Sequence, residues 1–236
     1  MPTETGHAKN LANFQDLISL CAASPGYNPA AAPLTAAALN LKHTAARSAL
    51  NNLISAQTIF NNAVNTRLMA FGGIKQLATR IINALHASGA DAETIKDAKT
   101  INRKIQGKRA ATKETPSAAN NGNTISATQL SHDQQAEHFS RLITLLTATP
   151  AYTPNEADIT LTALAAKLTE LKAANTAVIN AATACSNSRI TRNEQLYHPR
   201  TGLIATAVSV KKYIKSVYGA TSPQYKQVSG IRFKYR

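Results

Sequence analysis

Two stretches of this sequence decide its fold, because the second repeats the first 125 residues later. Residues 13–29 read NFQDLISLCAASPGYNP, and residues 138–154 read HFSRLITLLTATPAYTP. Between His7 and Arg67, 22 of 61 positions are identical to their counterparts in the second copy. After an insertion in the second copy the match continues at an offset of 129–130, with Gly89 over Gly219. A gapped match of this length indicates an internal duplication.

The duplication divides the chain into two expected domains. The first helical repeat spans residues 1–106, and the second spans residues 132–236 with a basic C-terminal tail. Between them, residues 107–131 read GKRAATKETPSAANNGNTISATQLS, which is rich in small and polar residues. This composition is typical of a linker.

Apolar spacing predicts an all-α fold in which each repeat is a bundle of three or four helices. Phe14, Leu17 and Ile18 recur at helical spacing, and Pro25 ends the first helix. We expect a second helix of about 40 residues, or ~60 Å, with Asn28 or Thr153 as its N-cap. Shorter helices are expected over 74–87 and 203–218, each followed by one more helix after a glycine.

Composition excludes several protein classes. Two cysteines cannot form a disulfide framework in 236 residues. The first ten residues, MPTETGHAKN, lack the basic head and apolar run of a secretory signal. The sequence has no run of ~18 apolar residues, so we expect no membrane insertion and a cytoplasmic location.

The sequence also argues against an enzyme. The six histidines include no pair at the i, i+4 spacing of a helical zinc site. Gly72 and Gly73 lack the further glycines and lysine of a phosphate-binding loop. Cys21 and Cys185 stand where the other copy has Leu146 and Phe60, so both are expected to be buried thiols. We therefore expect no catalytic residues, no metal site and no cofactor.

Charge points to the partner. Lys and Arg number 26 against 12 Asp and Glu, for a net charge of +14 that the two repeats share about equally. A charge this large favours polyanions, and nucleic acid is the first candidate, bound with little sequence specificity. Interleaved tyrosines could stack on bases. The expected polyanion-binding residues are Arg103, Lys104, Lys108, Arg109, Arg200, Lys211, Lys212, Lys215, Lys226, Arg232, Lys234 and Arg236.

The alternative function is a self-assembling structural subunit of a filament, layer or larger complex. In the final segment, SGIRFKYR, the apolar residues Ile231, Phe233 and Tyr235 alternate with basic ones. These three could contact a second copy in a homo-oligomer or filament. The same segment could instead pack on its own bundle.

The duplicated F-x-x-LI-x-L…P-x-Y-x-P unit, with the later YGATSPQYKQVSGI and the basic terminus, resembles a group of uncharacterised bacterial proteins. The resemblance covers most of both repeats. It implies a bacterial origin and a tandem helical architecture, and no activity, because the group has no assigned function.

Overall fold

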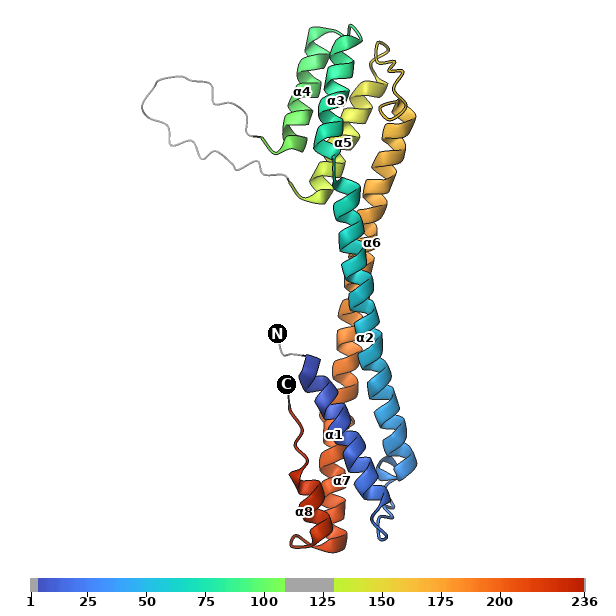
Figure 1. The fold of residues 1–236 in the computed structure, drawn as a ribbon, viewed down its shortest axis with the longest axis vertical. Helices are drawn as coiled ribbons and strands as arrows, with labels where there is room; N and C mark the ends of the chain where they lie inside the picture. The colour runs from blue at the N-terminus through green and yellow to red at the C-terminus, as the bar shows by residue number, and fades with distance from the viewer. Residues whose placement is uncertain (1–3, 109–129, 236) are drawn as a thin grey trace, which may run out of the picture. The chain divides into compact units, whose positions relative to one another are not determined.

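The fold is all-α, as expected. The computed structural model describes residues 4–108 and 130–235, and these residues form helices and no strand (Figure 1). The helices of the first repeat are α1 (Glu4–Ala22), the short 3-10 helix η1 (Ala32–Leu34), α2 (Ala36–Phe71), α3 (Ile74–Ala87) and α4 (Ala92–Gln106). Those of the second are α5 (His132–Thr147), α6 (Leu161–Tyr197), α7 (Leu203–Tyr218) and α8 (Pro223–Gly230).

The long helices begin later than the sequence suggests. The N-caps expected at Asn28 and Thr153 are wrong, because α2 begins at Ala36 and α6 at Leu161. The hydroxyls of Thr35 and Thr160 accept hydrogen bonds from the N–H groups three residues ahead, both at 3.3 Å. Hydroxyl acceptors here satisfy N–H groups that lack partners inside the helix.

A tyrosine holds the loop before each long helix. Tyr27 donates its hydroxyl to the carbonyl of Leu34 at 2.6 Å, and Tyr152 donates to that of Ile159 at 2.8 Å. Each bond joins residues seven positions apart and closes a compact turn, so the prolines at 29 and 154 lie in a loop and not in a first helical turn.

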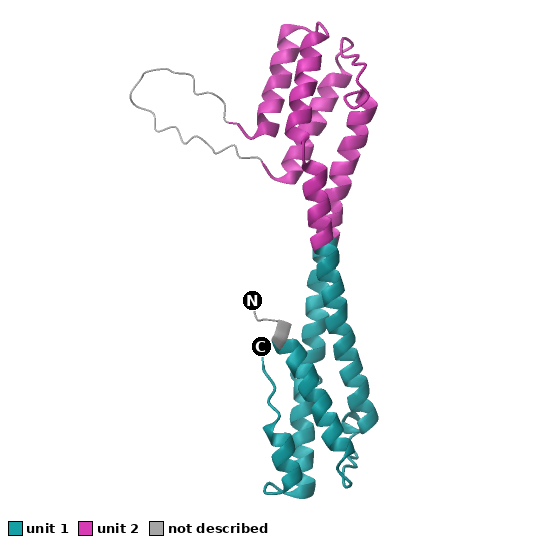
Figure 2. Ribbon diagram, in the orientation of Figure 1, with its two compact units in different colours: residues 1–60, 181–236 teal, residues 61–180 magenta. Residues whose placement is uncertain are grey.

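The chain forms two compact units, and each draws on both repeats (Figure 2). Unit 1 comprises Met1–Phe60 and Ala181–Arg236, and unit 2 comprises Asn61–Asn180. The expected boundaries, 1–106 and 132–236, follow the duplication but do not coincide with these units. The reason is helix length: α2 has 36 residues and α1 has 19, so α2 belongs to unit 1 up to Phe60 and to unit 2 from Asn61.

The core of unit 1 joins the first helices of repeat one to the last helices of repeat two. α7 packs on α1, η1 and α8. Phe14 and Leu39, from the first repeat, are completely buried with residues of the second repeat. The latter include Leu196, Leu203, Val210 and Ile214. Neither repeat alone supplies this core.

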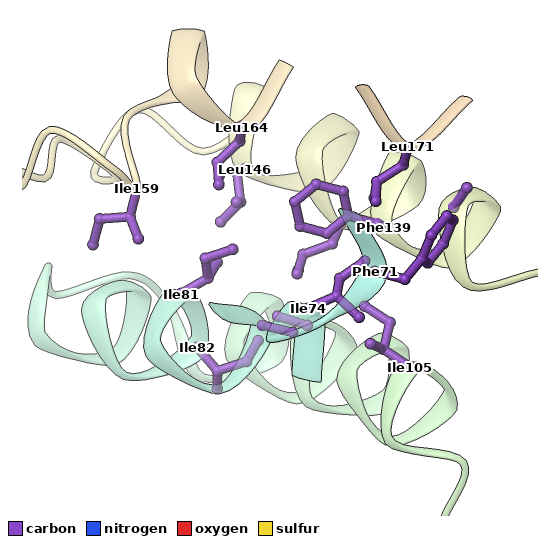
Figure 3. Packing of buried hydrophobic residues seen from close by; sticks show 14 of the residues in the cluster. Phe71, Ile74, Ile81, Ile82, Ile105, Phe139, Leu146, Ile159, Leu164 and Leu171 are labelled. Atoms are coloured by element: carbon purple, nitrogen blue, oxygen red, sulfur yellow. The ribbon is translucent and has the colours of Figure 1, made fainter. Parts of the chain in front are cut away.

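The core of unit 2 has the complementary composition. α4 packs on α3 and on α5, which belong to different repeats. Phe139, the counterpart of Phe14, lies among Phe71, Ile74 and Leu171 (Figure 3). Further along the same cluster, Ile81 faces Leu146 and Ile159 across the two repeats (Figure 3).

A histidine of each repeat also contacts an aromatic ring of the other. His7 lies edge-on to Tyr197 at 5.6 Å between ring centroids, and its Nδ1 is 2.6 Å from the tyrosine hydroxyl. His132, its counterpart, lies edge-on to Phe71 at 4.7 Å. His7 is buried, and its partner Tyr197 comes from the other repeat.

Cutting the chain between the repeats should leave its halves associated, because each unit needs helices from both. We expect full-length protein with a protease site placed within residues 110–128 to elute after cleavage at the volume of the intact protein. Its helical circular dichroism should be unchanged. The halves should separate in denaturant, which serves as the control. Two independently folded fragments, each eluting at half the mass, would contradict this arrangement.

Candidate polyanion-binding surface

Because each unit combines helices of both repeats, the charge is divided between the units differently from how it is divided between the repeats. The repeats carry about equal charge, but the residues of unit 1 include 13 Lys and Arg against three Asp and Glu, a net charge of +10. Those of unit 2 include 13 against nine, a net charge of +4. The excess positive charge is therefore concentrated in unit 1.

The acidic residues of unit 2 also engage some of its cations. The four ion pairs of the described chain all lie in unit 2: Arg80–Asp158, Lys96–Glu93, Arg141–Glu137 and Lys167–Glu170. Most of these side chains are more than half exposed, so the pairs contribute little to stability. Their main effect is to offset positive charge locally.

In unit 1, two predicted cations line one hollow. Arg200 and Lys212 surround a cavity of about 360 Å³ together with Tyr197, His198 and Tyr235. Arg200 belongs to the turn between α6 and α7, and Lys212 belongs to α7. Both side chains are exposed.

Local hydrogen bonds fix the turn that carries Arg200. Nδ1 of His198 accepts from the N–H of Thr201 at 3.1 Å. The carbonyl of Thr201 accepts from Lys42 Nζ at 2.7 Å, which ties this second-repeat turn to α2. At Gly202, a Cβ would meet the His198 carbonyl at 2.7 Å, so a glycine permits the turn.

A second hollow adjoins the first. It has a volume of about 310 Å³ and is lined by Lys211, Arg232 and Phe233, among others. Val208 and Tyr235 line both hollows, so the two form one continuous surface. We call residues 231–235, which follow α8, the tail. The two hollows together are the α7–tail surface, defined by Arg200, Val208, Lys212, Arg232 and Tyr235.

Two of the predicted lysines are engaged inside the unit. Lys211 donates from Nζ to the carbonyl of Ile231 and, at 3.4 Å, to that of Ser229, and it lies 5.5 Å from the centre of the Phe233 ring. Burial lowers the pKa of Lys211. Lys215 lies 5.7 Å from the centre of the Tyr225 ring. These two lysines hold the tail and α8 against α7.

The tail packs on its own unit. The side-chain amide of Asn10 donates to the carbonyl of Lys234 and accepts from its N–H, both at 2.8 Å. Asn13 donates to the carbonyl of Arg232 at 2.5 Å. Of the three residues proposed for assembly, Ile231 and Phe233 pack on the unit 1 core, and Tyr235 is 71% exposed.

The other predicted cations lie apart from this surface. Lys226 and Lys234 are exposed in unit 1, and Arg103, Lys104 and Lys108 belong to unit 2. Arg109 and Arg236 lie outside the described residues. Sequence reasoning missed Asn10 and His198, because the second copy has Gln135 in place of Asn10 and His198 lies in the insertion.

The described residues show neither a cluster of metal ligands nor a membrane-spanning helix. Within residues 4–108 and 130–235, no three His, Cys, Asp or Glu side chains gather as metal ligands would. The helices of that same part of the chain are too short or too polar to span a bilayer. Cys21 and Cys185 are both buried free thiols, as expected.

No family model, curated protein or solved structure matches this chain.

Replacing Asn10 should release the tail. Asn10→Ala removes three hydrogen bonds, two with Lys234 and one of 3.5 Å with the Tyr197 hydroxyl, from a completely buried side chain, so we expect the free energy of unfolding to fall by about 1–3 kcal/mol. Hydrogen exchange of the Lys234 amide should accelerate. Asn13→Ala, at an exposed position with one bond, is the matched control and should have the smaller effect. Unchanged exchange at Lys234 in Asn10→Ala would show that the bonds do not hold the tail.

Proposed function

We propose that this chain is a non-catalytic protein that binds nucleic acid with little sequence specificity through the α7–tail surface of unit 1. The observation that carries the proposal is the +10 charge of unit 1 together with three exposed cations, Arg200, Lys212 and Arg232, around two adjoining hollows. Exposed cations can contact phosphates, and phosphate contacts carry no sequence information.

The exposed ring of Tyr235 favours nucleic acid over other polyanions. Tyr235 lines both hollows and is 71% exposed, so its ring is available beside the cations. Bases stack on exposed aromatic rings, and each such contact is worth about 1–3 kcal/mol. A sulfated or phosphorylated polymer without bases would gain nothing from this ring.

The salt dependence of binding tests the proposal. We expect Arg200→Gln, Lys212→Gln and Arg232→Gln together to reduce the slope of log affinity against log salt by up to about three on duplex DNA. The matched control is Arg103→Gln, Lys104→Gln and Lys108→Gln in unit 2, which removes the same charge and should change the slope less. Tyr235→Ala should weaken single-strand binding without changing the slope. Absence of binding at ~50 mM salt, or equal effects of both triple variants, would refute the proposed surface.

Self-assembly is the alternative, and exposed apolar residues on the long helices favour it. In unit 1, the side chains of Ile54, Ile59 and Ile190 are 52%, 60% and 58% exposed. Such residues could pack on a second copy of the chain. The tail supports this function less, because Ile231 and Phe233 are already used within unit 1.

Light scattering of the protein alone separates the two functions. A structural subunit should form large species as its concentration rises without nucleic acid, and Ile54→Lys with Ile190→Lys should abolish them. A chain that stays monomeric under these conditions would leave nucleic-acid binding as the function.

A further inference from the structure

Unit 2 contains a pocket that the proposed function does not use. Its volume is about 480 Å³, within the range of small-molecule sites. One side is formed by α3 and its C-cap, with Arg80, Asn83, Ala84 and Ser88, and the other by the loop before α6, with Ala151, Tyr152 and Thr153.

In unit 1, two tyrosines of α7 occupy the corresponding place. The hydroxyl of Tyr213 accepts from the N–H of Asn28 at 3.2 Å, and that of Tyr218 accepts from the N–H of Gly26 at 2.8 Å. The ring of Tyr213 also lies edge-on to Tyr27, with 5.3 Å between centroids and 89° between planes.

Neither tyrosine has a counterpart ring in unit 2. α3 and α7 begin at Ile74 and Leu203, an offset of 129 that places Ala84 where unit 1 has Tyr213. Tyr218 corresponds to Gly89 at this offset and to Ser88 at an offset of 130. The pocket therefore exists because small side chains replace the two rings.

The loop that contacts these two rings in unit 1 nevertheless has a counterpart in unit 2. Tyr152 corresponds to Tyr27, and each donates its hydroxyl to the carbonyl seven residues ahead. Burial raises the pKa of Tyr152 to about 12, so this hydroxyl keeps its proton at neutral pH. The N–H of Thr153 occupies the position of the Asn28 N–H, which bonds Tyr213 in unit 1.

A second correspondence decides which of the two ring positions remains open. A Cβ on Gly26 would lie 2.9 Å from the Tyr218 hydroxyl, which is too close. Unit 2 has Ala151 at this position, so its methyl group obstructs a ring placed like Tyr218. The Tyr213 position keeps its hydrogen-bond donor. Thr153 corresponds to Asn28, so its N–H has the same place along the loop as the N–H that bonds Tyr213.

We propose that the pocket of unit 2 binds an aromatic ring that carries a hydroxyl group, at the position that Tyr213 occupies in unit 1. The hydroxyl oxygen accepts a hydrogen bond from the N–H of Thr153, and the ring lies against Tyr152. The ring can belong to a free phenol or to a tyrosine side chain of another polypeptide. This site is independent of nucleic-acid binding, since its residues belong to unit 2.

Titration of the full chain with p-cresol, followed by amide chemical shifts, tests the proposal. We expect the Thr153 and Ala84 amides to shift with a dissociation constant on the order of millimolar, as suits a ligand of this size. N-acetyltyrosinamide distinguishes the sources: if it binds as well as p-cresol, the site accepts a tyrosine side chain, and if it does not, the site takes a free phenol. N-acetylphenylalaninamide lacks the hydroxyl and should bind at least about tenfold more weakly than N-acetyltyrosinamide in the first case.

Exchanging residues between the units provides matched variants. Ala84→Tyr should fill the pocket with its own ring, weaken p-cresol binding at least about tenfold and leave the protein folded, because unit 1 accommodates the same ring. Tyr213→Ala should open the unit 1 counterpart, so that the Asn28 amide becomes responsive to p-cresol. The proposal is overturned if p-cresol shifts neither amide of the wild type, or if Ala84→Tyr binds p-cresol as the wild type does. It is also overturned if N-acetyltyrosinamide binds and N-acetylphenylalaninamide binds as tightly.

Discussion

The structure depends on a single constraint: the long helices α2 and α6 are about twice as long as the helices that pack on them. Each therefore extends from one unit into the other, and each unit buries apolar residues of both repeats. Phe14 is buried with Leu203, and Phe139 with Phe71, so every core depends on contacts between the repeats. The burial of apolar residues, rather than the linker, therefore holds the two repeats together.

This constraint also explains how a uniformly basic sequence acquires a strongly basic unit. The acidic residues of the first repeat lie mostly in its later helices, and those of the second mostly in its earlier ones, so both groups belong to unit 2. Unit 1 retains the acid-free segment from Arg200 onwards. An even charge along the chain thus becomes +10 in one unit and +4 in the other.

Much of the helical pattern could be predicted from the sequence. The bounds of α3 and the N-cap Asp91 follow from local signals: apolar spacing, glycines, and side chains that accept hydrogen bonds. The starts of α2 and α6 could not, because Thr-Pro and Asn-Pro favour a first helical turn, whereas Tyr27 and Tyr152 close a loop by bonds to residues seven positions ahead. The sequence also could not predict which helices form each unit, since apolar spacing does not reveal which helix covers a given face. For the same reason the sequence placed Lys211 among the ligand contacts, although a carbonyl of the tail engages it.

The bond between Asn10 and Lys234 joins positions 224 residues apart, and it has a consequence for biosynthesis. Unit 2 is continuous in sequence, so all of its residues are synthesised before any residue of the second part of unit 1, Ala181–Arg236. The apolar face of α1, with Phe14 and Leu17, must therefore wait for α7 and the tail before it is covered. A nascent chain that ends anywhere before residue 203 exposes this face, so the last helices to be synthesised complete the first part of the fold.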